Sequence, residues 1–196
     1  MAGLLEMAFP LLATLELSSW TVGELQTSAK GQKAAPVFCK QSPSPTFQLT
    51  TVDKPCLAPF GCNAYGDADG KATRRNLELD ISEEHATKLS ELDAWAEGEA
   101  ARLGLKGEYK PLCFPSKMGQ PRLRCKVTCT GPSAARWWST LREPLPSPMT
   151  QDYAGASIVP VVAVTKLWSM GGMHGLTAEL RHALVDLAGT EAPDFS

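Results

Sequence analysis

The sequence contains no uninterrupted apolar run of the ~20 residues needed to cross a bilayer, and it has no excess of basic residues. Its 19 basic and 21 acidic side chains exclude a histone-like polycation, although a local basic surface is compatible with this balance. The apolar N-terminus lacks a basic segment and contains Glu6 and Glu16, so we expect a folded strand there and not a signal peptide.

Motifs for catalysis, phosphate binding and metal binding are also missing. The chain has no GxxxxGK[ST] or GxGxxG, its six cysteines form no CxxC, and its three histidines are dispersed. The run Asp67-Ala-Asp69-Gly70 lacks the acidic twelfth position of a calcium loop. We therefore expect a non-catalytic intracellular protein with reduced cysteines, no cofactor and no metal. The sequence leaves open a Cys–His pair brought together by folding.

Residues 158–185 have the most regular pattern and predict a β-hairpin. Its first half is apolar on both faces, which is typical of a central strand buried on both sides. Lys166 and Trp168 then fall on one face, two residues apart. Glycines at 171, 172 and 175 suit the connection, and residues 176–184 alternate like a half-exposed strand.

Two further strands and one helix are expected. Residues 72–81 alternate as an amphipathic strand, and an amphipathic helix follows at about 82–103, with Ser82 as its N-cap. Residues 121–130 predict a strand with Leu123, Cys125, Val127 and Cys129 facing inward. The opposite face of that strand carries Arg122, Arg124 and Lys126.

The remaining segments show little periodicity. We expect a flexible loop at about 23–36, a Trp-rich loop at 131–157 and a frayed tail at 189–196. Residues 1–196 are expected to form a single domain with its core at about 10–188. Five or more strands with an inserted helix are compatible with an OB-like barrel.

Charge is distributed unevenly along the chain. Residues 104–142 contain eight basic side chains and one acidic, whereas residues 67–99 contain ten acidic and four basic. Alternate cations about 6.5 to 7 Å apart on one strand face match the phosphates of a single strand, and nearby rings match its unstacked bases. The alternative interpretation is an ordinary charged solvent face, with the Trp137-Trp138 pair in the core.

Several stretches, in this order, resemble a known family: 57–62 (LAPFGC), 76–81 (NLELDI), 92–95 (LDAW) and 167–177 (LWSMGGMHGLT). The order resembles that of single-stranded DNA-binding proteins of nucleo-cytoplasmic large DNA viruses and related algal and transposon-derived sequences. The resemblance covers about residues 45–188. It implies a mainly β, OB-like barrel of antiparallel strands with one or two helices, and a role in replication in the nucleus, the cytoplasm or a viral factory.

We therefore predict sequence-tolerant binding of single-stranded DNA or RNA. The expected phosphate contacts are Lys117, Arg122, Arg124 and Lys126, the expected stacking rings are Trp168, Trp137 and Tyr109, and Lys166 and Arg136 extend the surface. We also expect no membrane contact, a homo-oligomer as one option, and a protein partner for the acidic helix 82–103. The alternative function is a protein-interaction or assembly module that uses the 131–157 loop.

Overall fold

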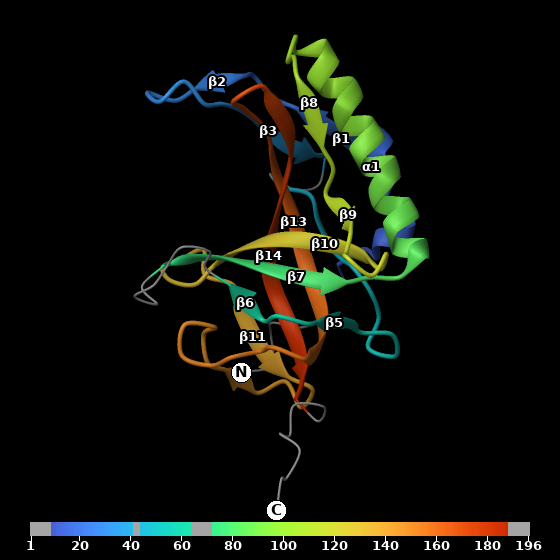
Figure 1. Ribbon diagram of the computed structural model, residues 1–196, viewed down its shortest axis with the longest axis vertical. Helices are drawn as coiled ribbons and strands as arrows, with labels where there is room; N and C mark the ends of the chain where they lie inside the picture. Colours follow the sequence, from blue (N-terminus) through green and yellow to red (C-terminus); the bar gives the residue numbers. More distant parts are fainter. Residues whose placement is uncertain (1–8, 41–43, 64–71, 188–196) are drawn as a thin grey trace, which may run out of the picture.

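A closed ring of five strands forms the centre of the molecule (Figure 1). In chain order they are β5 (Cys56–Ala58), β7 (Arg74–Asp80), β10 (Pro121–Thr128), β13 (Ala156–Met170) and β14 (Met173–Asp186). Each pairs with the next in the order β5–β7–β10–β14–β13, and β13 pairs back with β5. The fold is mostly β and is consistent with the predicted OB-like barrel with one inserted helix.

The structure is a computed structural model that describes residues 9–40, 44–63 and 72–187. The predicted frayed tail at 189–196 and the Asp67–Gly70 run therefore lie outside the described residues.

The long hairpin β13–β14 is the predicted one, and in Figure 1 it runs the length of the barrel. Met170 pairs with Met173, and the two glycines between them have φ of 60° and 76°, as a tight two-residue turn requires. Register shifts at Val161/Val162 and between Val164 and Lys166 are β-bulges or irregularities, which bend a long hairpin.

Three strand pairs in the described part of the chain are parallel, whereas antiparallel strands were expected throughout. One edge of β14 pairs with β13, and its other edge receives β8 (Glu108–Lys110), β10 and β11 (Arg136–Ser139) in succession, all three parallel.

Helix α1 (Glu83–Arg102) confirms the predicted helix at 82–103. The Ser82 hydroxyl accepts a hydrogen bond from the His85 backbone N–H, so the expected cap is present. The buried residues of the helix recur at helical spacing: Leu89, Leu92, Asp93, Ala96 and Ala100. Trp95 packs edge-on against Trp20, with ring centroids 5.7 Å apart.

Three segments differ from the sequence-based prediction. The expected loop at 131–157 contains β11 and a short strand at Pro144–Leu145. Residues 23–36, expected to be a flexible loop, contain β2 (Gln26–Thr27) and the start of β3 (Lys33–Cys39), which form a hairpin. Only alternate residues of β3, Ala35 and Val37, are buried, so its apolar signal is short and weak. The folded strand expected near the N-terminus is replaced within residues 11–22 by two 3-10 helices, Leu12–Thr14 and Leu17–Ser19, followed by the short β1 (Trp20–Val22).

Short strands complete the sheet. They are β4 (Thr46–Gln48) against β13, β6 (Cys62–Asn63) against β7, β9 (Cys113–Pro115) against β10, and β12 (Pro144–Leu145) against β11. None of the six cysteines, all of which lie in the described part of the chain, forms a disulfide, and burial raises the pKa of the Cys56 and Cys62 thiols to about 12 each. Such thiols stay protonated at neutral pH and are poor nucleophiles.

Candidate nucleic-acid interface

Strands β7 and β10 bring the acidic and the basic segment of the chain face to face. In their antiparallel register Arg122 lies opposite Asp80, and Arg124 lies opposite Glu78. Arg122 Nε donates to Asp80 Oδ1 at 2.5 Å, and Arg124 Nη2 donates to Glu78 Oε1 at 2.7 Å. Glu78 Oε2 also lies 3.7 Å from Arg122 Nη1. The two arginines are therefore neutralised by the neighbouring strand, which a count along the chain does not reveal.

Each of these arginines also lies over a phenylalanine. Arg122 Cζ is 4.8 Å from the ring centroid of Phe60, and Arg124 Cζ is 4.8 Å from that of Phe114. Their exposure differs: 16% of the Arg122 side chain is accessible, against 48% for Arg124. We call the surroundings of Arg122 the sealed end of β10, because its guanidinium is enclosed by two carboxylates and a ring.

Lys126, further along β10, has a different partner. It lies opposite Asn76, whose Oδ1 accepts a hydrogen bond of 2.7 Å from Lys126 Nζ. An amide satisfies the ammonium without cancelling its charge. Burial, reinforced by the charges of Arg124 and Arg74, lowers the pKa of Lys126, which indicates that cations are concentrated here.

Three hollows meet at Lys126 and Thr177, which line all of them. The largest, about 610 Å³, lies between the β13–β14 hairpin and the β2–β3 hairpin. The other two, about 230 and 220 Å³, extend towards Phe114 and towards Arg74. We call the three together the basic groove, whose cations are Lys33, Arg74, Arg75, Lys110, Arg124, Lys126 and Lys166. Its lining residues come from β2, β3, β7, β10, β13 and β14 and from the segment around β8 and β9, and none comes from α1, which lies on the right in Figure 1.

The acidic side chains near the basic groove are largely matched by other partners. Glu108 pairs with Lys110 at 2.5 Å, and Glu179 accepts from Thr165 and lies 3.4 Å from Arg181. Within residues 9–40, 44–63 and 72–187, no ion pair joins a carboxylate to Arg74, Lys126 or Lys166. These three cations therefore leave a positive potential at the centre of the groove.

Trp168 presents its ring to the two hollows on either side of it. It is half-buried and lines both the 610 Å³ and the 230 Å³ hollow. Its indole Nε1 donates to the Leu176 carbonyl at 3.0 Å, which fixes the plane of the ring against the hairpin. A Cβ on Gly175 would lie 2.5 Å from the Lys110 carbonyl and 3.4 Å from the Trp168 ring, so this glycine allows the close packing of β8.

The structure brings four of the nine predicted site residues together. Arg124, Lys126, Lys166 and Trp168 line the basic groove, so the basic strand face and the hairpin face are continuous there. Arg122 belongs to the sealed end. Lys117 is exposed in the turn between β9 and β10, at the opposite end of β10 from Lys126.

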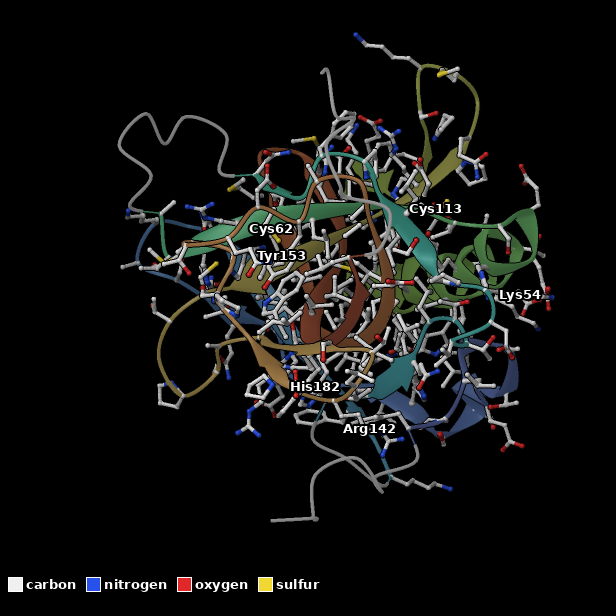
Figure 2. The ribbon with its side chains drawn as sticks, turned by 90° about the horizontal axis from the view of Figure 1, so that it is seen from below. Lys54, Cys62, Cys113, Arg142, Tyr153 and His182 are labelled. Atoms are coloured by element: carbon white, nitrogen blue, oxygen red, sulfur yellow. The ribbon has the colours of Figure 1, made fainter. Side chains whose placement is uncertain are left out.

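Trp137 and Tyr109, which were predicted to stack on bases, instead make contacts within the protein, and this corrects the sequence-based assignment. Trp137 is 3% exposed and stacks on Tyr153 with centroids 4.5 Å apart and planes 5° from parallel. Tyr153 is buried near the middle of the barrel end shown in Figure 2, and its hydroxyl donates to the Pro146 carbonyl at 2.6 Å. Trp137 is therefore a core residue, because β11 turns it towards the barrel interior.

Tyr109 contacts both helix α1 and strand β14 of the barrel. Its hydroxyl donates to Asp93 Oδ1 at 2.7 Å, and its ring lies edge-on to His174 at 5.5 Å. Asp93 also accepts from the Leu112 backbone N–H at 3.0 Å. Arg136 is exposed on β11. In the parallel register it lies opposite His182, which is beyond the part of β14 that lines the groove. Neither Tyr109 nor Arg136 lines the three hollows.

Sequence reasoning missed Arg74, Lys33 and Thr177. Arg74 and Asn76 are two residues apart in the strand predicted at 72–81 and so share a face, but the charge count included Arg74 in the acidic segment 67–99. Lys33 was hidden in the predicted loop. Thr177 carries no charge, and only the convergence of β14 with β10 places it at the centre of the groove.

No family model matches this chain, and no curated protein matches its sequence. None of the helices in the described part of the chain is long and apolar enough to span a membrane. The described residues also contain no group of three or more His, Cys, Asp and Glu side chains placed to hold a metal ion.

Proposed function

We propose that this protein binds single-stranded DNA or RNA in the basic groove, without catalysis. Arg74, Lys126 and Lys166 contact phosphates, and Trp168 stacks on a base. The observation that supports this most directly is that Lys126, Lys166 and Trp168 line the same hollow of about 610 Å³. The two lysines offer partners for a phosphate, and the neighbouring tryptophan ring offers a partner for a base.

The position of the ring favours an unpaired strand as the ligand. Trp168 lines a hollow that is also lined by cations. A base can stack on the Trp168 ring there only if the flat face of the base is free. In a duplex both faces of each base are covered by neighbours, whereas a single strand exposes them. The proposed footprint is therefore smaller than the one expected from the sequence, since it excludes Arg122, Trp137 and Tyr109.

The alternative of a protein-docking loop at 131–157 has weaker support. Because Trp137 packs against Tyr153, the two tryptophans do not form one exposed apolar patch. We retain the exposed acidic residues of α1, such as Glu84 and Glu91, as a candidate surface for a protein partner. The viral family resemblance and the replication role remain predictions.

A fluorescence titration with thymidine and uridine oligonucleotides at two salt concentrations tests the proposal. The variant Lys126→Ala/Lys166→Ala should bind more weakly, and the slope of log K against log [salt] should become shallower by about 1.4, since each phosphate contact with a single strand contributes roughly 0.7. The matched control is Lys54→Ala/Lys106→Ala, which removes two exposed lysines outside the groove. If the unmodified protein binds no oligonucleotide at low salt, the proposal is wrong.

A further inference from the structure

Arg124 is held in a fixed plane. Its Nε and Nη2 donate to the same Glu78 oxygen at 3.1 and 2.7 Å, and its Cζ lies 4.8 Å from the centroid of the Phe114 ring. A guanidinium is planar and delocalised, so contacts to its edge and to one face restrict its orientation. Glu78 itself is 7% exposed, which keeps the acceptor in place.

The rest of this guanidinium borders a cavity. Arg124 lines the hollow of about 230 Å³ together with Phe114, Trp168 and Leu176, and 48% of its side chain is exposed. This volume is below the ~300–1,000 Å³ of pockets for drug-sized ligands, so it suits one ring system at a time. Because Glu78 matches its charge, Arg124 offers a flat surface and contributes little net attraction for a phosphate.

Arg122 provides an internal comparison. It has the same kinds of neighbour, a carboxylate at 2.5 Å and a phenylalanine at 4.8 Å, but only 16% of its side chain is accessible. Arg122 is thus enclosed, whereas Arg124 has the same support and remains open on the side of the groove.

We propose that Arg124, supported by Phe114, is a stacking surface for an unpaired nucleobase and not a phosphate contact. Guanidinium planes and aromatic rings both stack on splayed bases in single-strand recognition. The 230 Å³ hollow then holds a base between Arg124 and Trp168, while Lys126 and Lys166 hold the adjoining phosphates. This inference rests on the proposed function and adds that the ligand must carry bases, so that a bare polyanion is a poor substitute.

The experiment compares a thymidine oligonucleotide with an abasic deoxyribose-phosphate strand of equal length. Arg124→Lys keeps the charge and removes the plane, so binding to the thymidine strand should weaken by about fivefold or more. Binding to the abasic strand and the salt slope should stay unchanged. Phe114→Leu removes the supporting ring and should give the same pattern. The matched control is Arg142→Lys, an exposed arginine in the β11–β12 turn.

A different pattern overturns the inference. If Arg124→Lys or Arg124→Gln weakens binding to both strands equally, and the Gln variant lowers the salt slope by about 0.7, Arg124 is a phosphate contact. If the unmodified protein binds the abasic strand as tightly as the thymidine strand, and the Lys126/Lys166 pair still matters, the base site is wrong while the groove stands. If the unmodified protein binds neither strand, the proposed function itself is wrong. Thermal unfolding checks that each variant is folded. If Arg124→Lys does not fold, the comparison of the two strands is made with Phe114→Leu.

Discussion

The two ends of β10 carry the same pattern of inward apolar and outward basic residues, yet they form different surfaces. At the sealed end Arg122 is paired with carboxylates and covered by a ring. At the groove end Lys126 faces an amide, and Arg74 and Lys166 line the same hollow. The difference arises on β7, where Asp80 and Glu78 give way to Asn76. The charge of a surface therefore depends on the cross-strand partner as much as on the strand itself.

The two ends also differ in what surrounds them. At the sealed end, β9 pairs with Pro121–Leu123, and Gln120 Nε2 donates to the Ile81 carbonyl at 2.7 Å. At the groove end, Lys126 lies opposite Glu179 in the parallel register of β10 with β14, and the surface opens towards β2 and β3. The sealed end thus stabilises the link between barrel and helix, and the groove end is left accessible to a ligand.

The largest expected effect comes from the inner face, which both ends share. Leu123 is 0% exposed, and Leu123→Ala should lower the free energy of unfolding by about 2–5 kcal/mol through lost burial and a cavity. Urea unfolding measures this change. The salt slope of oligonucleotide binding should stay the same in the folded variant, and a change in slope would show that the inner and outer faces are not independent.

A pH effect should follow from Asp93, which anchors the segment just before β9. Burial raises the pKa of Asp93 from 3.8 to about 6, despite hydrogen bonds from Tyr109 and Leu112 that lower it. The folded protein then binds more protons than the unfolded chain between about pH 4 and 6, so this group's contribution to stability is full below that window and is lost as pH rises through it. The loss by neutral pH is up to about 3 kcal/mol.

Urea unfolding from pH 4 to 7 tests this effect as the difference between the unmodified protein and Asp93→Asn. The unmodified protein should lose stability relative to the variant as pH rises, because Asn does not ionise. A constant difference across this range would refute the assignment to Asp93.

Removing the carboxylate shared by the two arginines should make the sealed end resemble the groove end. Glu78→Gln should lower the free energy of unfolding by about 1–3 kcal/mol, since a buried charged acceptor is lost. The same change should steepen the salt slope of oligonucleotide binding, because the charge of Arg124 would no longer be matched by Glu78 and would be available to a phosphate. Glu143→Gln, an equal charge change at an exposed site, is the control. An equal steepening in that control would attribute the effect to net charge.

The smallest effect is expected at Lys117, beyond the sealed end. This exposed residue lies in the turn before β10, away from the basic groove. Lys117→Ala should change stability by less than about 0.5 kcal/mol and leave oligonucleotide affinity nearly unchanged. A clear loss of affinity, measured by fluorescence titration, would extend the footprint along the whole of β10.

The sequence by itself determined the elements whose signal is local. Ser82 with the apolar spacing that follows predicted α1, the paired glycines predicted the β13–β14 turn, and alternation predicted which face of β10 is basic. These features depend on neighbours within a few residues, so a single chain reveals them. The helix, the hairpin and the outward direction of Lys126 were accordingly predictable.

Only the tertiary structure decided which charges and rings remain available. Trp137 and Trp168 were both predicted to be stacking rings, but one stacks on Tyr153 in the core and the other lines the groove. Arg124 and Glu78 are 46 residues apart in the chain and form an ion pair through strand register. Burial and pairing are set by contacts between distant segments, which local propensity does not encode. The fold class was therefore accessible from sequence, whereas the site required the register of β7 against β10.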